Sequence, residues 1–249
     1  MFLFVTISAA KLQSVHGFAI MMPTRFKEAI PLAETRFALF DFDGTLCRGD
    51  SIVPYLRFCI AEGLAPRSQW VRAACGWLSQ AVMPSRIVSA KERSLSFIAG
   101  RTVEEMDTLA RRFFETELKP RFFADGLREI DRLLAENYHI IVISASADVY
   151  MRVLPEFLPC ETVIATPCVT EDGRYTGAIE ANCKGLMKYH RFLAYTREHD
   201  YIIDREKLRC YGDSPGDVEM MHMAVLPTAV NASRKLLAAL PVAERAKWK

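Results

Sequence analysis

The sequence predicts an α/β fold in which a parallel sheet is covered by helices on both faces. The first observation is that short apolar runs alternate with segments whose apolar residues recur at helical spacing. The second is that acidic or hydroxyl side chains follow directly after several of these runs. The third is one long helical stretch, from residue 51 to about residue 118, that contains no convincing strand. We therefore expect a Rossmann-like core with an α-helical cap inserted after the first strand.

The predicted core strands are short and apolar, as buried parallel strands are. The first comprises residues 37–40 and ends abruptly at Asp41 and Gly44. The later strands are predicted at residues 139–143, 162–165, 208–211 and near 228–230. Helices are predicted at residues 125–137, 148–157 and 185–198 and after Pro215. The pair Asp172-Gly173 predicts a hairpin turn.

The helical stretch is divided into about four helices by Pro66, Pro84 and Gly100. We expect it to form a separate cap, because strands and helices alternate again only after it. The expected regions are an N-terminal extension at 1–35, a core at 36–47 and 121–249, and the cap at 48–120.

Composition and charge exclude several classes of partner. The formal net charge of the 249 residues is +2, so no basic face indicates nucleic acid. No run approaches the roughly 18 continuous apolar residues of a membrane span, and apolar Met1–Ala10 lacks a basic segment before it. Met21, Met22 and Pro23 leave open that the first twenty residues are a disordered extension or precede the true start.

The seven cysteines are scattered and include no C-x-x-C pair, which favours free thiols in a reducing compartment, the cytoplasm. The sequence carries no signal for an oligomeric state.

The first candidate motif is Asp41-Phe42-Asp43-Gly44-Thr45-Leu46, directly after the first strand. Parallel α/β sheets place their sites at the carboxyl ends of strands. Because the chain turns here, one carboxylate could hold a metal while the other faces a leaving group, and Gly44 permits the turn. The alternative is an acidic surface turn.

Two further motifs also follow predicted strands. Asp213 and Asp217, in Gly-Asp-Ser-Pro-Gly-Asp, offer the oxygen ligands that magnesium prefers, or they cap a loop. Ser144, followed by Ala145 and Ser146, offers a hydroxyl and backbone amides to a phosphate, or it is an ordinary helix N-cap.

A fourth motif is a lysine on the helix after Asn182. The ammonium of Lys184 or Lys188 would offset phosphate and carboxylate charge at a site, although most lysines are solvated surface residues.

These four elements, in this order, resemble the four motifs of the haloacid dehalogenase superfamily over roughly residues 36 to 235. The helical insert is similar to the cap of the subgroup that contains phosphoserine phosphatase. The same subgroup has a segment similar to the run Asp172-Gly173-Arg174-Tyr175-Thr176-Gly177 followed by Cys183-x-Gly185-x-x-Lys188. That register favours Lys188 as the lysine of the third motif, whereas Lys184-Gly185 matches the form in phosphoserine phosphatase.

The resemblance implies a magnesium-dependent phosphomonoester hydrolase that acts through a phospho-aspartate. Asp41 would be the nucleophile, and Asp43 would be the acid that protonates the leaving oxygen and then the base that activates water. Mg²⁺ would be held by Asp41, the Asp43 backbone carbonyl and Asp213, with Asp217 close by. The residues implied for the phosphoryl group are Ser144, Ala145, Lys188, Gly44 and Thr45.

The cap would select the leaving group. The chain departs from phosphoserine phosphatase at Gly44, where that enzyme has serine, and at Asp50, where it has a substrate-binding glutamate. Substrates similar to phosphoserine, histidinol phosphate and phosphatidylglycerophosphate therefore stay open. Arg86, Lys91 and Arg93 could meet a second anionic group of the substrate, or they are exposed cap charges.

A lipid phosphomonoester would need an apolar surface beside the site. Such a surface could be formed by apolar residues flanked by arginines, namely Trp70, Trp77, Leu78, Val82 and Met83 with Arg67, Arg72 and Arg86. The alternative is that the apolar side chains form the inside of the cap and the arginines its charged surface. The rival functions are a phosphoryl transferase of the phosphomutase type and a non-catalytic binding protein on the same fold.

Overall fold

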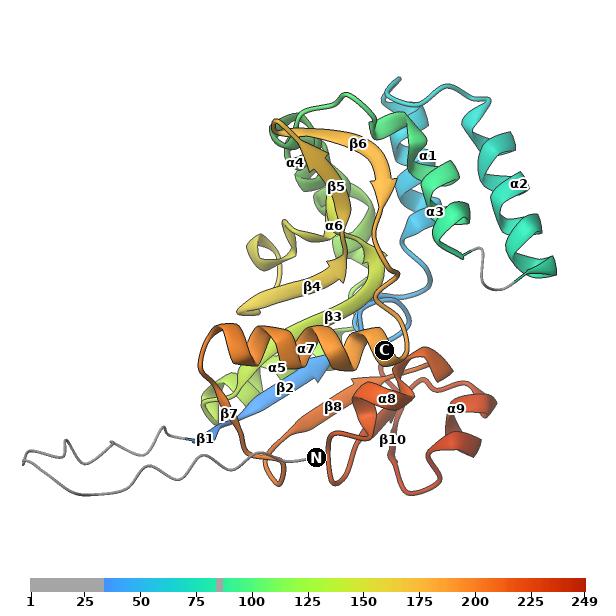
Figure 1. Ribbon diagram of the computed structural model, residues 1–249. Coiled ribbons are helices and arrows are strands. Elements are labelled where there is room, and N and C mark those ends of the chain that lie inside the picture. Colours follow the sequence, from blue (N-terminus) through green and yellow to red (C-terminus); the bar gives the residue numbers. More distant parts are fainter. Residues whose placement is uncertain (1–33, 84–86) are drawn as a thin grey trace, which may run out of the picture. The chain divides into compact units, whose positions relative to one another are not determined.

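The core is a six-stranded parallel sheet, as the computed structural model shows for residues 34–83 and 87–249 (Figure 1). The strand order is β10-β9-β8-β2-β3-β4, and β2 lies between β3 and β8, with Leu39 opposite both Ile141 and Cys210. The bounds are β2 Phe37–Phe40, β3 His139–Ala147, β4 Thr162–Thr166, β8 Arg209–Gly212, β9 Thr228–Val230 and β10 Glu244–Ala246. The predicted fold class is confirmed.

Both faces of the sheet are covered, because alternate residues of β2 join different apolar clusters. Ala38 and Phe40 face the cluster that includes α5 (Ala124–Ala135). Phe37 and Leu39 face the cluster that includes α7 (Leu186–Glu198), α8 (Val218–Met221) and α9 (Arg234–Ala239). All four β2 side chains are fully buried, which explains why the run lacks polar residues.

The segment after β2 is helical, as expected. Its helices are α1 Ile52–Ala61, α2 Gln69–Val82, α3 Ile87–Leu95 and α4 Val103–Phe113, followed by a π-helical turn at Phe114–Leu118. A capping box between Thr102 and Glu105 begins α4. Pro84, expected to separate two helices, lies outside the described residues.

The hairpin predicted at Asp172-Gly173 is formed by β5 (Cys168–Glu171) and β6 (Arg174–Ile179). It pairs with the cap, since the backbone N–H of Gly100 donates to the carbonyl of Tyr175 at 2.8 Å and Thr102 forms a β-bridge with Arg174. The cap therefore has a partner contributed by a segment that we expected to belong to the core.

Several element bounds differ from the prediction. The helix predicted at 148–157 is broken into α6 (Asp148–Met151) and a 3₁₀ turn at Leu154–Glu156, with Pro155 in that turn. The strand predicted at 139–143 continues to Ala147 through an irregularity in its pairing with β4. The helix after Pro215 begins as a 3₁₀ turn and is short.

Glu34 and Thr35, placed in the N-terminal extension, form β1, which pairs with β7 (Ile202–Ile203). The expectations for residues 1–33 lie outside the described residues. Within the described ranges, no helix is long and apolar enough to cross a membrane. The seven cysteines are free thiols.

Candidate active site

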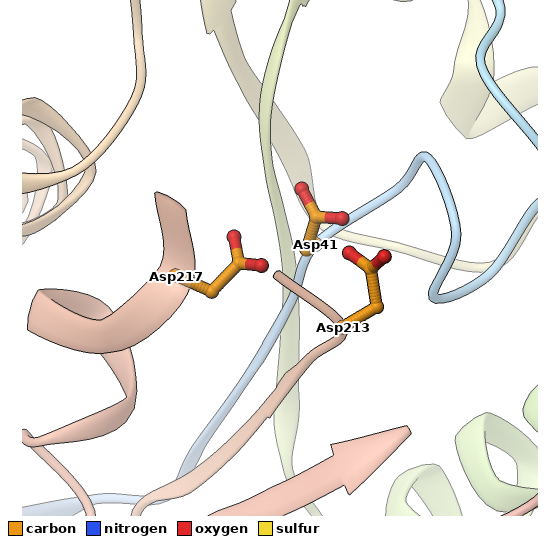
Figure 2. A group of neighbouring side chains, drawn as sticks. All are labelled: Asp41, Asp213 and Asp217. Carbon is orange, nitrogen blue, oxygen red and sulfur yellow. The ribbon is translucent and has the colours of Figure 1, made fainter. Parts of the chain in front are cut away.

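The four predicted motifs meet at the carboxyl edge of the sheet. Asp41 directly follows β2, and Asp213 directly follows the neighbouring β8. Asp217 ends the 3₁₀ turn after β8, and Lys188 lies in the first turn of α7. Figure 2 shows the carboxylates of Asp41, Asp213 and Asp217 gathered at this edge, each from a different part of the backbone. Neighbouring parallel strands thus bring together residues that are far apart in sequence.

The carboxylates of Asp41, Asp213 and Asp217 each have an oxygen within 4.8 Å of the others. Lys188, only 1% exposed, donates from Nζ to Asp41 Oδ1 at 2.5 Å and to Asp217 Oδ1 at 2.7 Å. Burial alone would lower the pKa of Lys188, but the two carboxylates raise it above its ordinary value, so the lysine is charged. One lysine still leaves three clustered carboxylates with an excess of negative charge.

The residues of this cluster fit Mg²⁺. Burial, and next the nearby Asp217, raise the pKa of Asp213 to about 6 and that of Asp41 well above its ordinary value. A divalent cation would relieve this repulsion, and carboxylates are the ligands that Mg²⁺ prefers. Gly44 has φ +86°, and a Cβ there would lie 2.5 Å from an Asp213 oxygen, so only glycine admits that carboxylate. Asp41 and Asp213, the Asp43 carbonyl and Asp217 would hold the ion.

Asp43 has different surroundings. Its Oδ2 accepts hydrogen bonds from Ser146 Oγ at 2.5 Å and Ser51 Oγ at 3.1 Å, and Ser51 Oγ lies 3.0 Å from the hydroxyl of Tyr150. Its Oδ1 is buried without a hydrogen-bond partner in the described part of the chain. Burial, and next the charge of Asp50, raise the pKa of Asp43 to about 6. This carboxyl can therefore hold or release a proton near neutral pH.

Sequence reasoning missed Ser51 and Tyr150 and gave Ser146 no role of its own. Ser51 is separated from Ser146 by 95 positions and from Tyr150 by 99, and a lone serine before a helix indicates only an N-cap. No signal in the sequence pairs these side chains.

The candidate phosphate-binding residues differ in their placement. Thr45 Oγ1 donates to Asp41 Oδ2 at 3.3 Å, and Ser144 Oγ accepts from the backbone N–H of Ser146 at 3.0 Å. Both side chains are buried, whereas Gly44 and Ala145 line the cavity in front of Asp41. That cavity has a volume of about 340 Å³, and its other lining residues are Asp43, Gly49, Asp50, Lys184, Lys188, Asp213, Ser214, Gly216 and Asp217.

The two candidate lysines both reach this cavity. Lys188 is fixed by two ion pairs, while Lys184 is exposed and lies across Gly216, where a Cβ would come within 2.6 Å of the lysine Cε. Lys188 is therefore a buried lysine within the acidic cluster, whereas Lys184 lies at the mouth of the cavity.

The apolar residues proposed for a lipid-facing surface do not share one environment. Trp70 and Trp77 are half-buried, whereas the side chain of Leu78 is 67% exposed and that of Met83 is 46% exposed. Arg67 and Arg72 are exposed, and the Val82 side chain and Arg86 lie outside the description.

The chain is similar to several known proteins. Phosphoserine phosphatase SerB1 of Mycobacterium tuberculosis is 25% identical over 217 residues, which cover 83% of this chain and 68% of that protein. A protein with unknown function from Bordetella pertussis matches with a TM-score of 0.75 and 22% identity, over 86% of this chain and 99% of that one.

A solved structure of a phospho-aspartyl intermediate analogue of phosphoserine phosphatase matches with a TM-score of 0.57 and 20% identity, over 87% of this chain and 95% of that one. Both structural likenesses support the fold. A family model described as haloacid dehalogenase-like hydrolase matches residues 38–222.

Proposed function

Since this chain belongs to the haloacid dehalogenase-like hydrolase family, as its motifs predicted, we propose that it hydrolyses a phosphomonoester through a phospho-aspartate on Asp41. The observation that carries the proposal is the contrast between two neighbouring carboxyls. Asp41 is ion-paired with Lys188 inside the acidic cluster. Asp43 has hydrogen bonds from two serines and a raised pKa. Burial raises the pKa of both carboxyls, but the ammonium of Lys188 favours the anionic form of Asp41, whereas Asp43 accepts only from neutral hydroxyls and can carry a proton.

In the first step, a carboxylate oxygen of Asp41 bonds to phosphorus while the bond from phosphorus to the leaving oxygen breaks. The Asp43 carboxyl gives its proton to that oxygen. In the second step, Asp43 takes a proton from a water whose oxygen attacks phosphorus, and the bond from Asp41 to phosphorus breaks. The products are an alcohol, inorganic phosphate and the original enzyme.

Lys188 orients Asp41 and, with Ala145 and the Gly44-Thr45 turn, would face the phosphoryl oxygens. Ser144 would act by shaping residues 144–146, which include Ala145, through the hydrogen bond that it accepts from the backbone N–H of Ser146. Bound Mg²⁺ would supply positive charge that screens the repulsion between Asp41 and the phosphate.

The proposed substrate is a small phosphomonoester, since the cavity at Asp41 has a volume of only about 340 Å³. A lipid phosphomonoester stays in the panel of substrates because Leu78 and Met83 are exposed on the cap. The free thiols are compatible with the cytoplasm as the proposed compartment.

Phosphate release from para-nitrophenyl phosphate, phosphoserine, histidinol phosphate and phosphatidylglycerophosphate tests the activity. We expect release with Mg²⁺ and its loss with EDTA. Added methanol then tests the intermediate: a shared phospho-aspartate gives the same ratio of methyl phosphate to phosphate from every substrate. A ratio that changes with the leaving group contradicts the covalent step. Phosphoryl transfer to a second substrate without phosphate release favours a phosphomutase.

A further inference from the structure

A second cavity of about 200 Å³ lies beside the one at Asp41. The two share Asp43, Asp50, Ala145 and Lys184. The second cavity alone is lined by Ile52, Trp77, Lys91, Ser146 and Asn182, so its wall contains residues of the cap helices α1, α2 and α3. Because Asp43 lies between the two spaces and is the proposed proton donor to the leaving oxygen, the leaving group would extend into the second one.

Lys91 of α3 reaches across to the core at this place. Its Nζ donates to the backbone carbonyl of Ala145 and to Oδ1 of Asn182. Both acceptors are held by the core, since Thr166 Oγ1 donates to Ala145 O at 2.7 Å and lies within hydrogen-bond distance of Asn182 Oδ1, at 3.1 Å. The ammonium group is therefore fixed in the cavity wall and not free in solvent.

Among the described residues, the ammonium of Lys91 has no ion-pair partner in contact with it. Both acceptors are neutral, and across residues 34–83 and 87–249 no carboxylate lies within 4.0 Å of its nitrogen, the limit for an ion pair. A lysine ammonium has three donors, of which these contacts use two. Burial lowers the pKa of Lys91 to about 8, although the carboxylates of Asp43 and Asp50, which do not contact it, act to raise it. An anion in contact with the ammonium would offset the effect of burial.

The other charged groups of the cavity leave room for such an anion. Asp50 uses one carboxylate oxygen, Oδ1, to accept from the backbone N–H of Ile52 at 2.9 Å. Lys184 is exposed and has no hydrogen bond or ion pair to any described residue, so its ammonium group is available to an anion in this cavity. Arg93, which the sequence made an equal candidate for an anionic group, lines a different cavity on the cap.

We propose that Lys91, with Asn182 and Lys184 beside it, forms a subsite for a second anionic group, a carboxylate or another phosphate, on the leaving group of the substrate. The inference rests on the proposed phosphatase activity. The volume of about 200 Å³ limits the leaving group to a few carbon atoms beyond the ester oxygen. Lys91 is thus a specificity-determining residue supplied by the cap.

The test compares substrates that differ in one charge. The carboxylate pair is 3-phosphoglycerate and glycerol 3-phosphate, and the phosphate pair is propane-1,3-diol bisphosphate and 3-hydroxypropyl phosphate. We expect wild-type kcat/KM to favour the charged member of one pair by about ten- to hundredfold, as for a charge-assisted hydrogen bond. The preferred pair identifies the anion.

Lys91→Met should remove this preference while changing kcat/KM for the uncharged member by less than about threefold. Lys91→Arg should retain part of the preference because it keeps the charge. Arg93→Met, on the same helix, should behave as wild type. If Lys91→Met lowers kcat/KM equally for the charged and the uncharged substrate of a pair, the subsite is overturned. The same holds if wild type does not prefer the charged substrate in either pair.

Failure of the phosphatase proposal is recognised separately. If wild type releases no phosphate from any compound, binding of glycerate and of propyl phosphate is measured by calorimetry. If either compound binds wild type at least tenfold more tightly than it binds Lys91→Met, the subsite is supported even though the phosphatase proposal fails. If each compound binds the two proteins with equal affinity, the subsite is overturned.

Discussion

The two ends of the parallel sheet hold their carboxylates in opposite ways. At the carboxyl end, Asp41 and Asp213 have raised pKa values, and the one buried lysine of the cluster, Lys188, pairs with Asp41 and Asp217. At the amino end, Glu161 precedes β4 and accepts hydrogen bonds from Tyr195 at 2.5 Å, Tyr201 at 3.0 Å and His139. Partial burial raises the pKa of Glu161, but the hydrogen bonds from these partners lower it by more, so the pKa lies below its ordinary value.

The contrast separates function from stability. A carboxylate with every partner in place stabilises the fold, whereas carboxylates crowded together cost stability unless a cation or a substrate joins them. Substitutions at the two ends should therefore have opposite consequences for activity and for melting temperature.

The largest effect is expected for Asp41→Asn. This change removes the proposed nucleophile with almost no change of volume, so kcat should fall by about 10⁴-fold or more. The melting temperature without Mg²⁺ should be unchanged or higher, because one of the crowded charges is gone. Steady-state kinetics and thermal unfolding provide both readouts, and retained turnover would sink the phospho-aspartate mechanism.

Asp43→Asn should reduce kcat by about 10²- to 10⁴-fold, since it removes the proton donor and acceptor. Mg²⁺ affinity, measured by calorimetry, should stay within about threefold of wild type because the backbone carbonyl remains. The loss should be smallest for para-nitrophenyl phosphate, whose leaving group needs no proton. An equal loss for every substrate would argue against the acid role of Asp43.

Ser51→Ala tests the positioning of Asp43 by the cap. It removes one of two hydrogen bonds to Oδ2, so we expect roughly a tenfold lower kcat with KM little changed. Ser79→Ala, on α2, is the matched control, because Ser79 donates only to the carbonyl of Gly76 within its helix. Identical kinetics of both variants would show that Asp43 needs no such support.

Glu161→Gln should leave activity unchanged but reduce the free energy of unfolding by about 1 kcal/mol at neutral pH. Because folding lowers the pKa of Glu161, its contribution is present above the ordinary pKa of a glutamate and is lost as the pH falls through the lower, folded value. Denaturant unfolding of wild type and variant should therefore converge at acidic pH. A constant difference at all pH values would contradict this assignment.

The sequence predicted the parts of the site that local pattern determines. Asp41 and Asp213 each follow an apolar run, and neighbouring parallel strands must bring their carboxyl ends together. The contacts between cap and core could not be predicted in this way. Helix packing brings Ser51 to Tyr150 and Lys91 to Ala145. The orientation of these helices produces no periodic pattern in the sequence from which the contacts could be predicted. The bulge that extends β3 to Ala147 likewise depends on its pairing with β4.

The central position of β2 also determines when a working site can exist during synthesis. Its neighbours β3 and β8 lie far downstream, and Lys188 follows Asp41 by 147 positions. Contacts of such long sequence separation form slowly, and domains fold as units while the chain emerges from its N-terminus. A nascent chain that ends before β8 therefore has an apolar, half-paired β2 and no acidic cluster. We expect such a chain to require protection from aggregation and to be inactive until residue 217 has emerged.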